Sequence, residues 1–266
     1  TVINNPKNII SVGINAKSQL NTISKFQKIK KLNKTYFLIP KESYKEEIES
    51  AIKKSNLKKY KVYFYESEPT KLTSQIEKIT RYTIRKQNLK DEIKRIENSN
   101  EYNKEKKIEI LKKRDTLGRV NFDSLIIADF DESLKSVTTS LMYSDISPKK
   151  IYFITLNQWF DKSLLNEEST QPIYFPSINK KNYEEFKENY FQKFKEYPNE
   201  LSFLSYDLIG LVYYLVAQNN FGFDKKIFLK KNSFKGKVGI FEIKNNKINH
   251  ILNFYKVEDN KFKKIF

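Results

Sequence analysis

Residues Phe122–Val137 read FDSLIIADFDESLKSV, and this stretch decides the fold class. The apolar run Asp123–Ala128 (DSLIIA) predicts a buried strand, and the apolar spacing from Ser133 to Tyr143 predicts a helix directly after it. A second apolar run, Lys150–Leu156 (KIYFITL), predicts the next strand. Short apolar strands separated by helices are typical of βαβ units, whose strands are parallel. The sequence therefore predicts an α/β fold.

The same alternation extends toward the N-terminus. The segment Ser18–Leu32 has apolar residues at helical spacing, and a second helix is expected to begin at Ser43, with Glu46 three residues on as in a capping box. Three further strands are predicted at Ile9–Ile14, Thr35–Ile39 (TYFLI, closed by Pro40) and Lys61–Tyr65 (KVYFY).

A long charged stretch interrupts this pattern between Thr70 and Lys113. It keeps a rough helical period that breaks at Asn98–Asn100, which predicts two antiparallel helices inserted between strands. The narrow apolar stripe of these helices suits a projecting arm. The heptads are too few and too irregular to predict a coiled coil.

Beyond Lys150–Leu156 the sequence predicts one more short strand and two helices, and only its last part changes to antiparallel β structure. Ile173–Phe175 is interpreted as a short edge strand, and helices are predicted at Tyr183–Tyr197 and Leu201–Gln218. Antiparallel strands are then expected at Val238–Ile243, Ile248–Val257 and Phe262–Phe266, with turns at Asn245–Asn246 and Asp259–Asn260.

The composition is that of a folded, soluble chain. Hydrophobic residues make up 39% and aromatic residues 14% of the 266 residues, which argues against disorder. The sequence contains no run of about 18 apolar residues, so it predicts no membrane span. The absence of cysteine excludes disulfides, thiolate nucleophiles and cysteine-ligated metals.

The formal charge of +18 raises the question of nucleic-acid binding. Only five of the 50 cationic residues are arginine, the residue best suited to phosphate and base contacts. We therefore interpret the charge as lysine on solvated faces and expect no nucleic-acid partner. An anionic membrane or glycan surface stays compatible with it.

Motifs for catalysis are absent from the sequence. None of the six glycines forms a phosphate-binding loop, and no GxSxG segment is present. The sole histidine, His250, falls in a predicted strand, where an ordinary strand role is expected. We expect no enzyme activity, no catalytic or metal-binding residues and no cofactor.

Polar and aromatic residues follow the predicted strands. Asp129 and Asp131 come directly after DSLIIA, at the strand end where open α/β sheets bind ligands. The alternative, which we favour, is that these carboxylates stabilise the N-terminus of the next helix. Trp159 follows KIYFITL, preceded by Asn157 and Gln158, and a large aromatic beside amide side chains is suited to a sugar or amino-acid ligand.

Two of these assignments have alternatives. Trp159 would equally well pack in the protein core. Tyr44 follows TYFLIP at the same topological end and is a further candidate for lining a cleft, although a helix cap fully explains the adjacent Ser43.

The order of segments resembles that of type I periplasmic binding proteins. The segments that carry the resemblance are TYFLIP-KESYKEE, FDSLIIADFDESLKSV, KIYFITLNQW, PIYFPSI, FKENYFQKFKEYPNELSFLSYDLIGLVYYL and FKGKVGIFEIKNNK. Within that superfamily the sequence is most similar to the penicillin-binding protein activator (LppC-like) lipoproteins, through RDTLGRVNFDSLII, LMYSDI and NQWFD.

The resemblance implies two lobes of parallel sheet flanked by helices, with the first lobe incomplete because the likeness begins partway into the family domain. On this plan residues 1–69 are the remainder of the N-terminal lobe and the crossover, and 70–118 are the helical-hairpin insertion. Residues 119–200 are the second lobe, and 201–266 are a helix and β hairpins that return toward the first lobe.

The resemblance also implies a protein that binds and does not catalyse. Members of the activator group are periplasmic lipoproteins that stimulate peptidoglycan synthases, held at the outer membrane by a lipid that would precede Thr1. Other relatives deliver amino acids or similar small molecules to ABC transporters. Mapped by motif, the ligand-binding candidates are Tyr44, Asp129, Asn157, Trp159 and Asp207, although a helix-start role is preferred for Asp207.

Overall fold

The computed structural model describes residues 13–41, 45–222, 232–237, 239–244 and 247–266. The predicted strand Ile9–Ile14, apart from its last residue, lies outside this part of the chain. The predicted helix start at Ser43 and the turn at Asn245–Asn246 also lie outside it.

A seven-stranded sheet forms the centre of the molecule, in the order β10-β9-β5-β4-β3-β1-β2. The first five strands along the chain pair in parallel, and β9 and β10 join the β5 side as antiparallel strands. The strands are β1 (Thr35–Pro40), β2 (Tyr60–Tyr65), β3 (Ser124–Ile127), β4 (Tyr152–Thr155), β5 (Ile173–Ser177), β9 (Asn253–Glu258) and β10 (Lys261–Lys264).

The predicted α/β fold with a parallel sheet is confirmed. All residues of β1 and β3 are buried, as continuous apolar runs predict for strands covered on both faces. Phe37 of β1 pairs with Val62 of β2 on one side and with Ile126 of β3 on the other. Strands β1 and β2, which fall within residues 1–69, lie in the same sheet as β3–β5.

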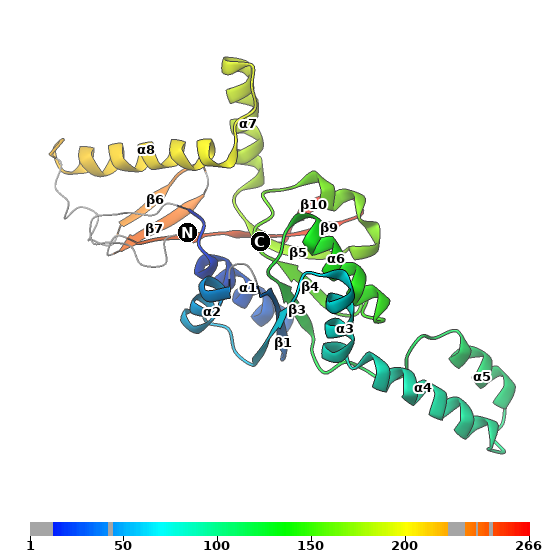
Figure 1. Cartoon of the computed structure of the whole chain (residues 1–266). Helices are drawn as coiled ribbons and strands as arrows, with labels where there is room; N and C mark the ends of the chain where they lie inside the picture. The colour runs from blue at the N-terminus through cyan, green and yellow to red at the C-terminus, as the bar shows by residue number, and fades with distance from the viewer. Residues whose placement is uncertain (1–12, 42–44, 223–231, 238, 245–246) are drawn as a thin grey trace.

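Helices cover both faces of this sheet (Figure 1). On one face α1 (Ala16–Lys30) and α2 (Lys45–Lys54) pack over one core cluster. On the other face α3 (Pro69–Thr80) and α6 (Asp131–Tyr143) pack against each other over a second cluster. Both clusters take side chains from alternate positions of β1 and β3, so the sheet is buried on both sides.

The helical insertion differs from its prediction at one point. The break at Asn98–Asn100 is confirmed, because it separates α4 (Tyr82–Glu97) from α5 (Lys104–Lys112). A second break at Arg81, which has a left-handed backbone (φ 56°), separates α3 from α4. Helix α3 therefore packs on the sheet, and α4 and α5 alone project from the body as an arm (Figure 1).

The C-terminal part forms a second, smaller layered unit. Helix α7 (Lys180–Phe194) leads into α8 (Glu200–Gln218), which packs on a three-stranded antiparallel sheet of β6 (Asn232–Lys235), β7 (Ile240–Lys244) and β8 (Lys247–Ile251). Leu211 and Leu215 of α8 share a core cluster with Phe241 of β7.

Two strand predictions are wrong in detail. The segment Ile248–Val257 is not one strand, because the chain leaves the small sheet after Ile251 and enters the main sheet at Asn253. The edge strand expected at Ile173–Phe175 is instead internal, since β5 lies between β4 and β9. The predicted turn at Asp259–Asn260 joins β9 to β10, with positive φ at both residues as a type I′ turn requires.

Helix α8 is apolar on two faces, and the described residues cover only one. Its exposed face carries Leu201 (70% exposed), Tyr206 (56%), Ile209 (70%) and Tyr213 (67%). By length and hydropathy alone α8 would suit a membrane span. The other face of α8 packs on the small sheet, where Asp207 is buried. We therefore interpret α8 as a helix that packs on the small sheet with one face and has a second apolar face suited to another packing partner.

Candidate functional site

A cavity of about 1000 Å³ lies at the carboxyl ends of β3 and β4. Its walls come from the loops after those strands, the starts of α1 and α2, and the facing parts of α7 and α8. The parallel strands run in the order β2-β1-β3-β4-β5, so this cavity sits at the edge where open α/β sheets bind their ligands. The cavity is large enough for a small-molecule ligand.

The loop after β3 brings Phe130 and Asp131 to the cavity, while Asp129 lies behind them. Asp129 is buried, and its carboxylate accepts hydrogen bonds from the Tyr65 hydroxyl and from the Phe130 N–H (3.0 Å). Burial raises the pKa of the Asp129 carboxyl, against the opposing effect of these two hydrogen bonds. The predicted ligand residue Asp129 therefore holds the loop through Tyr65, and Asp131 is the carboxylate that lines the cavity.

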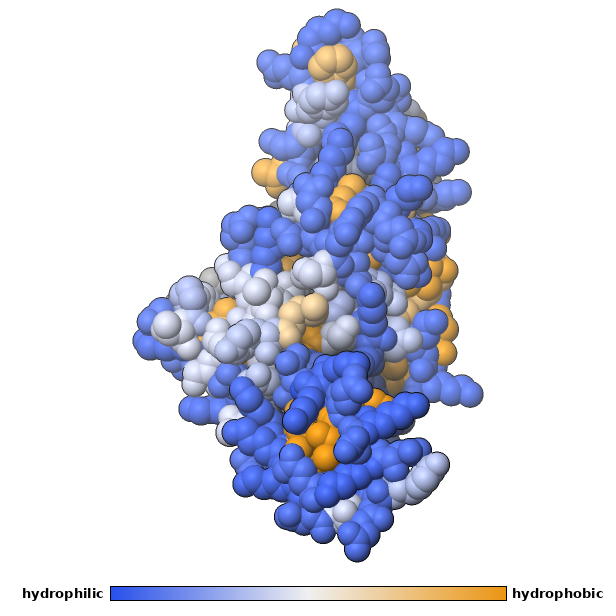
Figure 2. Space-filling view, turned by 90° about the vertical axis from the view of Figure 1, so that its right-hand side faces the viewer, coloured by the Kyte–Doolittle hydropathy of each residue, from blue (hydrophilic) through white to orange (hydrophobic). Residues whose placement is uncertain are grey.

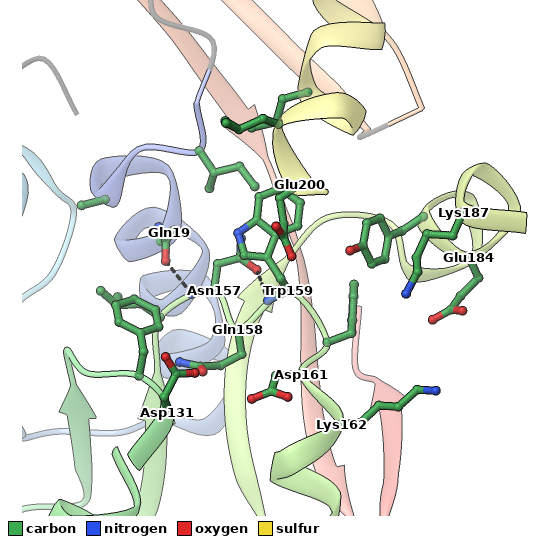
Figure 3. A pocket seen from close by; sticks show the side chains of 18 of the residues that line it. Gln19, Asp131, Asn157, Gln158, Trp159, Asp161, Lys162, Glu184, Lys187 and Glu200 are labelled. Atoms are coloured by element: carbon green, nitrogen blue, oxygen red, sulfur yellow. Dashed lines mark hydrogen bonds between the residues drawn. The ribbon is translucent and has the colours of Figure 1, made fainter. Parts of the chain in front are cut away.

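The loop after β4 is held by the buried amides of Asn157 and Gln158. The Asn157 side-chain oxygen accepts from the Ser177 hydroxyl (2.7 Å) and the Trp159 N–H (3.1 Å), and the Asn157 N–H donates to Gln19 (2.8 Å; Figure 3). The Gln158 side-chain nitrogen donates to the Asp129 carbonyl (3.3 Å) and to Thr155 (2.9 Å).

These contacts fix an uncommon backbone. Trp159 (φ 49°) and Phe160 (φ 58°) are consecutive left-handed residues, and Asp131 across the cavity is also left-handed (φ 48°). Such conformations are costly for residues other than glycine and persist where surrounding contacts impose them. Their effect is to turn the half-buried Trp159 ring toward the cavity, where it lies 6.1 Å from the Tyr183 ring.

The remaining candidates from the sequence lie elsewhere. Asp207 is buried in α8 and accepts a hydrogen bond from the Lys237 N–H (2.7 Å), so it joins α8 to the small sheet and does not line the cavity. Tyr44 lies outside the described residues. Of the five candidates, the structure therefore brings Asn157 and Trp159 together in the cavity. His250 is buried in β8 with its ring against Phe241.

Several cavity residues were not singled out from the sequence. Tyr183, Glu184 and Lys187 come from α7, and Glu200, Leu201 and Leu204 come from the start of α8. They meet the strand ends only through the tertiary fold, so no local signal marks them. Within the described part of the chain, no group of three or more His, Asp or Glu side chains is arranged to hold a metal ion.

Solved structures identify the fold class as that of type I periplasmic binding proteins. The leucine-binding protein LivK from Thermotoga maritima matches with a TM-score of 0.60 and 14% identity, over 98% of this chain and 67% of LivK. No protein-family profile matches the sequence, and no curated protein is significantly similar to it.

LpoA from Haemophilus influenzae, whose C-domain is described as a regulator of PBP1A, has the same fold. That C-domain matches with a TM-score of 0.57 and 11% identity, over 99% of this chain and 73% of the domain. Full-length LpoA matches with a TM-score of 0.55 and 11% identity over 95% of this chain, which spans only 40% of LpoA. At these identities the likeness establishes the fold alone.

Proposed function

We propose that this chain belongs to a non-catalytic protein of the bacterial cell envelope that activates a peptidoglycan synthase by direct contact. The fold, which it shares with the LpoA C-domain, supports this proposal. The observation that carries it is the projecting arm of α4 and α5 (Figure 1). These helices do not cover the central sheet, so they are free to contact a partner.

The arm is held to the body at its base and carries exposed side chains farther out. Arg85, in the first turns of α4, is buried and donates to the Thr80 carbonyl (3.1 Å) and the Thr116 hydroxyl (2.9 Å). Farther out, α5 has no buried residue, Tyr102 is 86% exposed and Ile110 is 48% exposed. A base that is held by buried hydrogen bonds and an outer part with exposed side chains suit an element that contacts a partner protein.

The surface of the arm is mixed in character. Figure 2 views the molecule from the side on which the arm projects, and the near, lower part of the surface shows one apolar area enclosed by hydrophilic residues. The charged residues form ion pairs among themselves, as between Arg95 and Glu101 (2.7 Å) and between Lys107 and Glu101 (2.8 Å). An apolar centre with a charged rim is typical of a protein contact.

The test is binding of the 266-residue chain to a class A peptidoglycan synthase of the PBP1A type, measured by biolayer interferometry together with the glycan polymerisation rate. We expect Tyr102→Ala and Ile110→Asp to weaken binding by about tenfold together, since exposed anchors at a contact dominate its energy. Ile29→Asp is the matched control, because Ile29 is a similarly exposed (54%) isoleucine on α1, away from the arm. Absence of binding and of stimulation would refute the proposal.

This proposal places the protein in the periplasm. We propose further that a lipid on a preceding segment attaches the protein to the outer membrane. Fractionation of cells that express the full gene tests it, because a lipid-anchored protein sediments with outer-membrane vesicles and leaves them only with detergent.

A second candidate function is binding of a small solute for a transporter. The cavity at the carboxyl ends of β3 and β4 favours it, because Trp159 faces this space and two buried amides hold its loop. The fold shared with LivK, described as a leucine-binding protein, also supports it. The two functions are compatible, since a solute in the cavity and a partner on the arm occupy different surfaces.

A further inference from the structure

The charge of the cavity is opposite to the charge of the chain. The chain has 50 lysines and arginines against 32 acidic residues. The cavity, in contrast, is lined by five carboxylates and two lysines; the carboxylates are Glu47, Asp131, Asp161, Glu184 and Glu200. A hollow lined by one sign of charge concentrates ligands of the opposite sign.

Acceptor groups in this cavity are left open. Gln158 is 5% exposed, and both of its described hydrogen bonds are donated by Nε2, to the Asp129 carbonyl and to Thr155. The Asp129 carbonyl can only accept, so reversing the amide would lose that bond. In the orientation shown, Oε1 has no hydrogen-bond donor among the described residues. The Gln158 side chain points toward Asp131 (Figure 3), whose carboxylate has no ion pair or hydrogen bond within the described chain.

An aromatic wall lies beside these acceptors. The half-buried Trp159 ring and Phe130 line the same cavity, with Tyr183 beyond Trp159. Aromatic faces attract cations, and aromatic rings also bury alkyl chains. The wall and the open acceptors therefore select for the same kind of ligand.

The two lysines of the lining lie on the far side of the cavity from Asp131. Figure 3 shows Lys162 and Lys187 on the side of α7, and the Lys187 ammonium lies over the rings of Tyr183 (5.4 Å) and Tyr197 (5.7 Å). An α-amino acid carries its ammonium and carboxylate on one carbon atom. The carboxylate of an α-amino acid held at Asp131 would therefore lie close to Asp131 and away from both lysines, with neither of them to balance its charge.

We propose that this cavity binds an organic primary amine that has no carboxylate next to the ammonium group. The ammonium donates to the Asp131 carboxylate and to Oε1 of Gln158, and the alkyl chain lies against Trp159. The assignment rests on the second candidate function, a solute-binding cavity, and narrows its ligand to a cationic class.

The experiment is isothermal titration of the 266-residue chain with three probes that share one branched alkyl group. They are 3-methylbutylamine, leucine and 4-methylpentanoate, which are the amine, the amino acid and the acid. We expect the amine to bind at one site with an affinity that falls as salt increases, and to bind at least about tenfold more tightly than leucine. The acid is expected not to bind.

The variants locate the site. Asp131→Asn is expected to weaken amine binding by about tenfold, and asparagine tolerates the left-handed backbone at this position, so the loop is kept. Glu132→Gln is the control, since Glu132 neighbours Asp131 in the chain, is 85% exposed and does not line the cavity.

Binding of leucine or the acid as tightly as the amine would overturn the assignment of the ligand class while keeping the solute-binding function. Absence of binding by all three probes would overturn both. Amine binding that is unchanged by Asp131→Asn would overturn the site.

Discussion

The guanidinium of Arg85 donates a hydrogen bond to the main-chain carbonyl of Ser144, and this bond joins the base of α4 to the end of α6. Both residues are buried, and Asp145 adds a longer ion pair at 3.8 Å. Burial lowers the pKa of the Arg85 guanidinium, and the charge of Asp145 opposes that change. A buried cation with several fixed acceptors therefore helps to attach the arm to the α/β body.

Replacement of this cation is expected to loosen the arm. Arg85→Leu leaves the acceptors on Thr80, Thr116 and Ser144 without their donor in a buried place, and we expect a loss of about 3 kcal/mol in the free energy of unfolding. Urea denaturation measures the loss, and limited trypsin digestion should cut the arm sooner. Arg95→Leu is the control on the same helix, because Arg95 is exposed, and its midpoint should equal that of the wild type. Equal midpoints for both variants would contradict the anchoring role.

The buried carboxyl of Asp129 gives a prediction for pH. Because the pKa of Asp129 is raised in the folded state, the folded protein holds its proton more tightly than the unfolded chain does. The resulting stability is fully present below the unfolded pKa, near 3.9, and is lost as pH rises through the raised folded pKa. Asp129→Asn removes this dependence while keeping an acceptor for Tyr65. We therefore expect the variant to gain stability relative to the wild type as pH rises from about 3.5, and then to level off.

Urea titrations between pH 3.5 and 8 measure this difference. Asp91→Asn is the control for the substitution itself, since Asp91 is an exposed aspartate on α4, away from Asp129. A wild-type protein that gains stability over Asp129→Asn with rising pH would contradict the assignment.

The strands whose residues are all buried could be predicted from the sequence. The runs at Thr35–Ile39 and Asp123–Ala128 are apolar at successive positions because both faces of β1 and β3 are covered, and this leaves a local signal. Strand β6, with the sequence NSFK, has no such run and was missed. The change of sheet near Leu252 was also missed, because an apolar residue continues the strand pattern there while the tertiary fold redirects the chain.

Cavity residues could be predicted only where they directly follow a parallel strand, because ligands of open α/β sheets bind at the carboxyl ends of the strands. Asn157 and Trp159 follow β4 directly and do line the cavity. The left-handed backbone at Trp159 and Phe160 could not be foreseen, because neither residue favours it and only the hydrogen bonds of the loop impose it. Glu200 enters the cavity from a helix about forty residues further on, and no local sequence pattern reports such a contact.

Gly236 permits the close approach of α8 to the small sheet. A Cβ atom at this position would overlap the Asp207 carboxylate, which accepts the Lys237 N–H. We expect Gly236→Ala to cost about 2 kcal/mol of unfolding free energy in thermal or urea denaturation. The double variant with Asp207→Ala should lose less than the sum of the two single variants, because the overlap is then removed. Gly13→Ala is the control, since no described residue lies within 4 Å of an added Cβ there. Strict additivity would contradict the close approach.

One face of α8 is not covered by any described residue, and we expect it to make the 266-residue chain self-associate. Leu201, Ile209 and Tyr213 present an apolar surface with no charge among them, and such surfaces are buried by whatever apolar partner is available. We expect the mean mass in sedimentation velocity to rise with protein concentration. Ile209→Lys should lower the apparent association constant by about tenfold, since burying one isoleucine contributes about 1.5–3 kcal/mol.

Ile29→Lys places the same charge on an isoleucine of comparable exposure on α1, and it should leave the association unchanged. Binding of the dye ANS offers an independent reading, and it should fall in Ile209→Lys alone. A chain that stays monomeric at all concentrations, with equal dye binding in both variants, would show that this face of α8 is not available to solvent. The interpretation of α8 as a helix with one apolar face exposed to solvent would then be wrong.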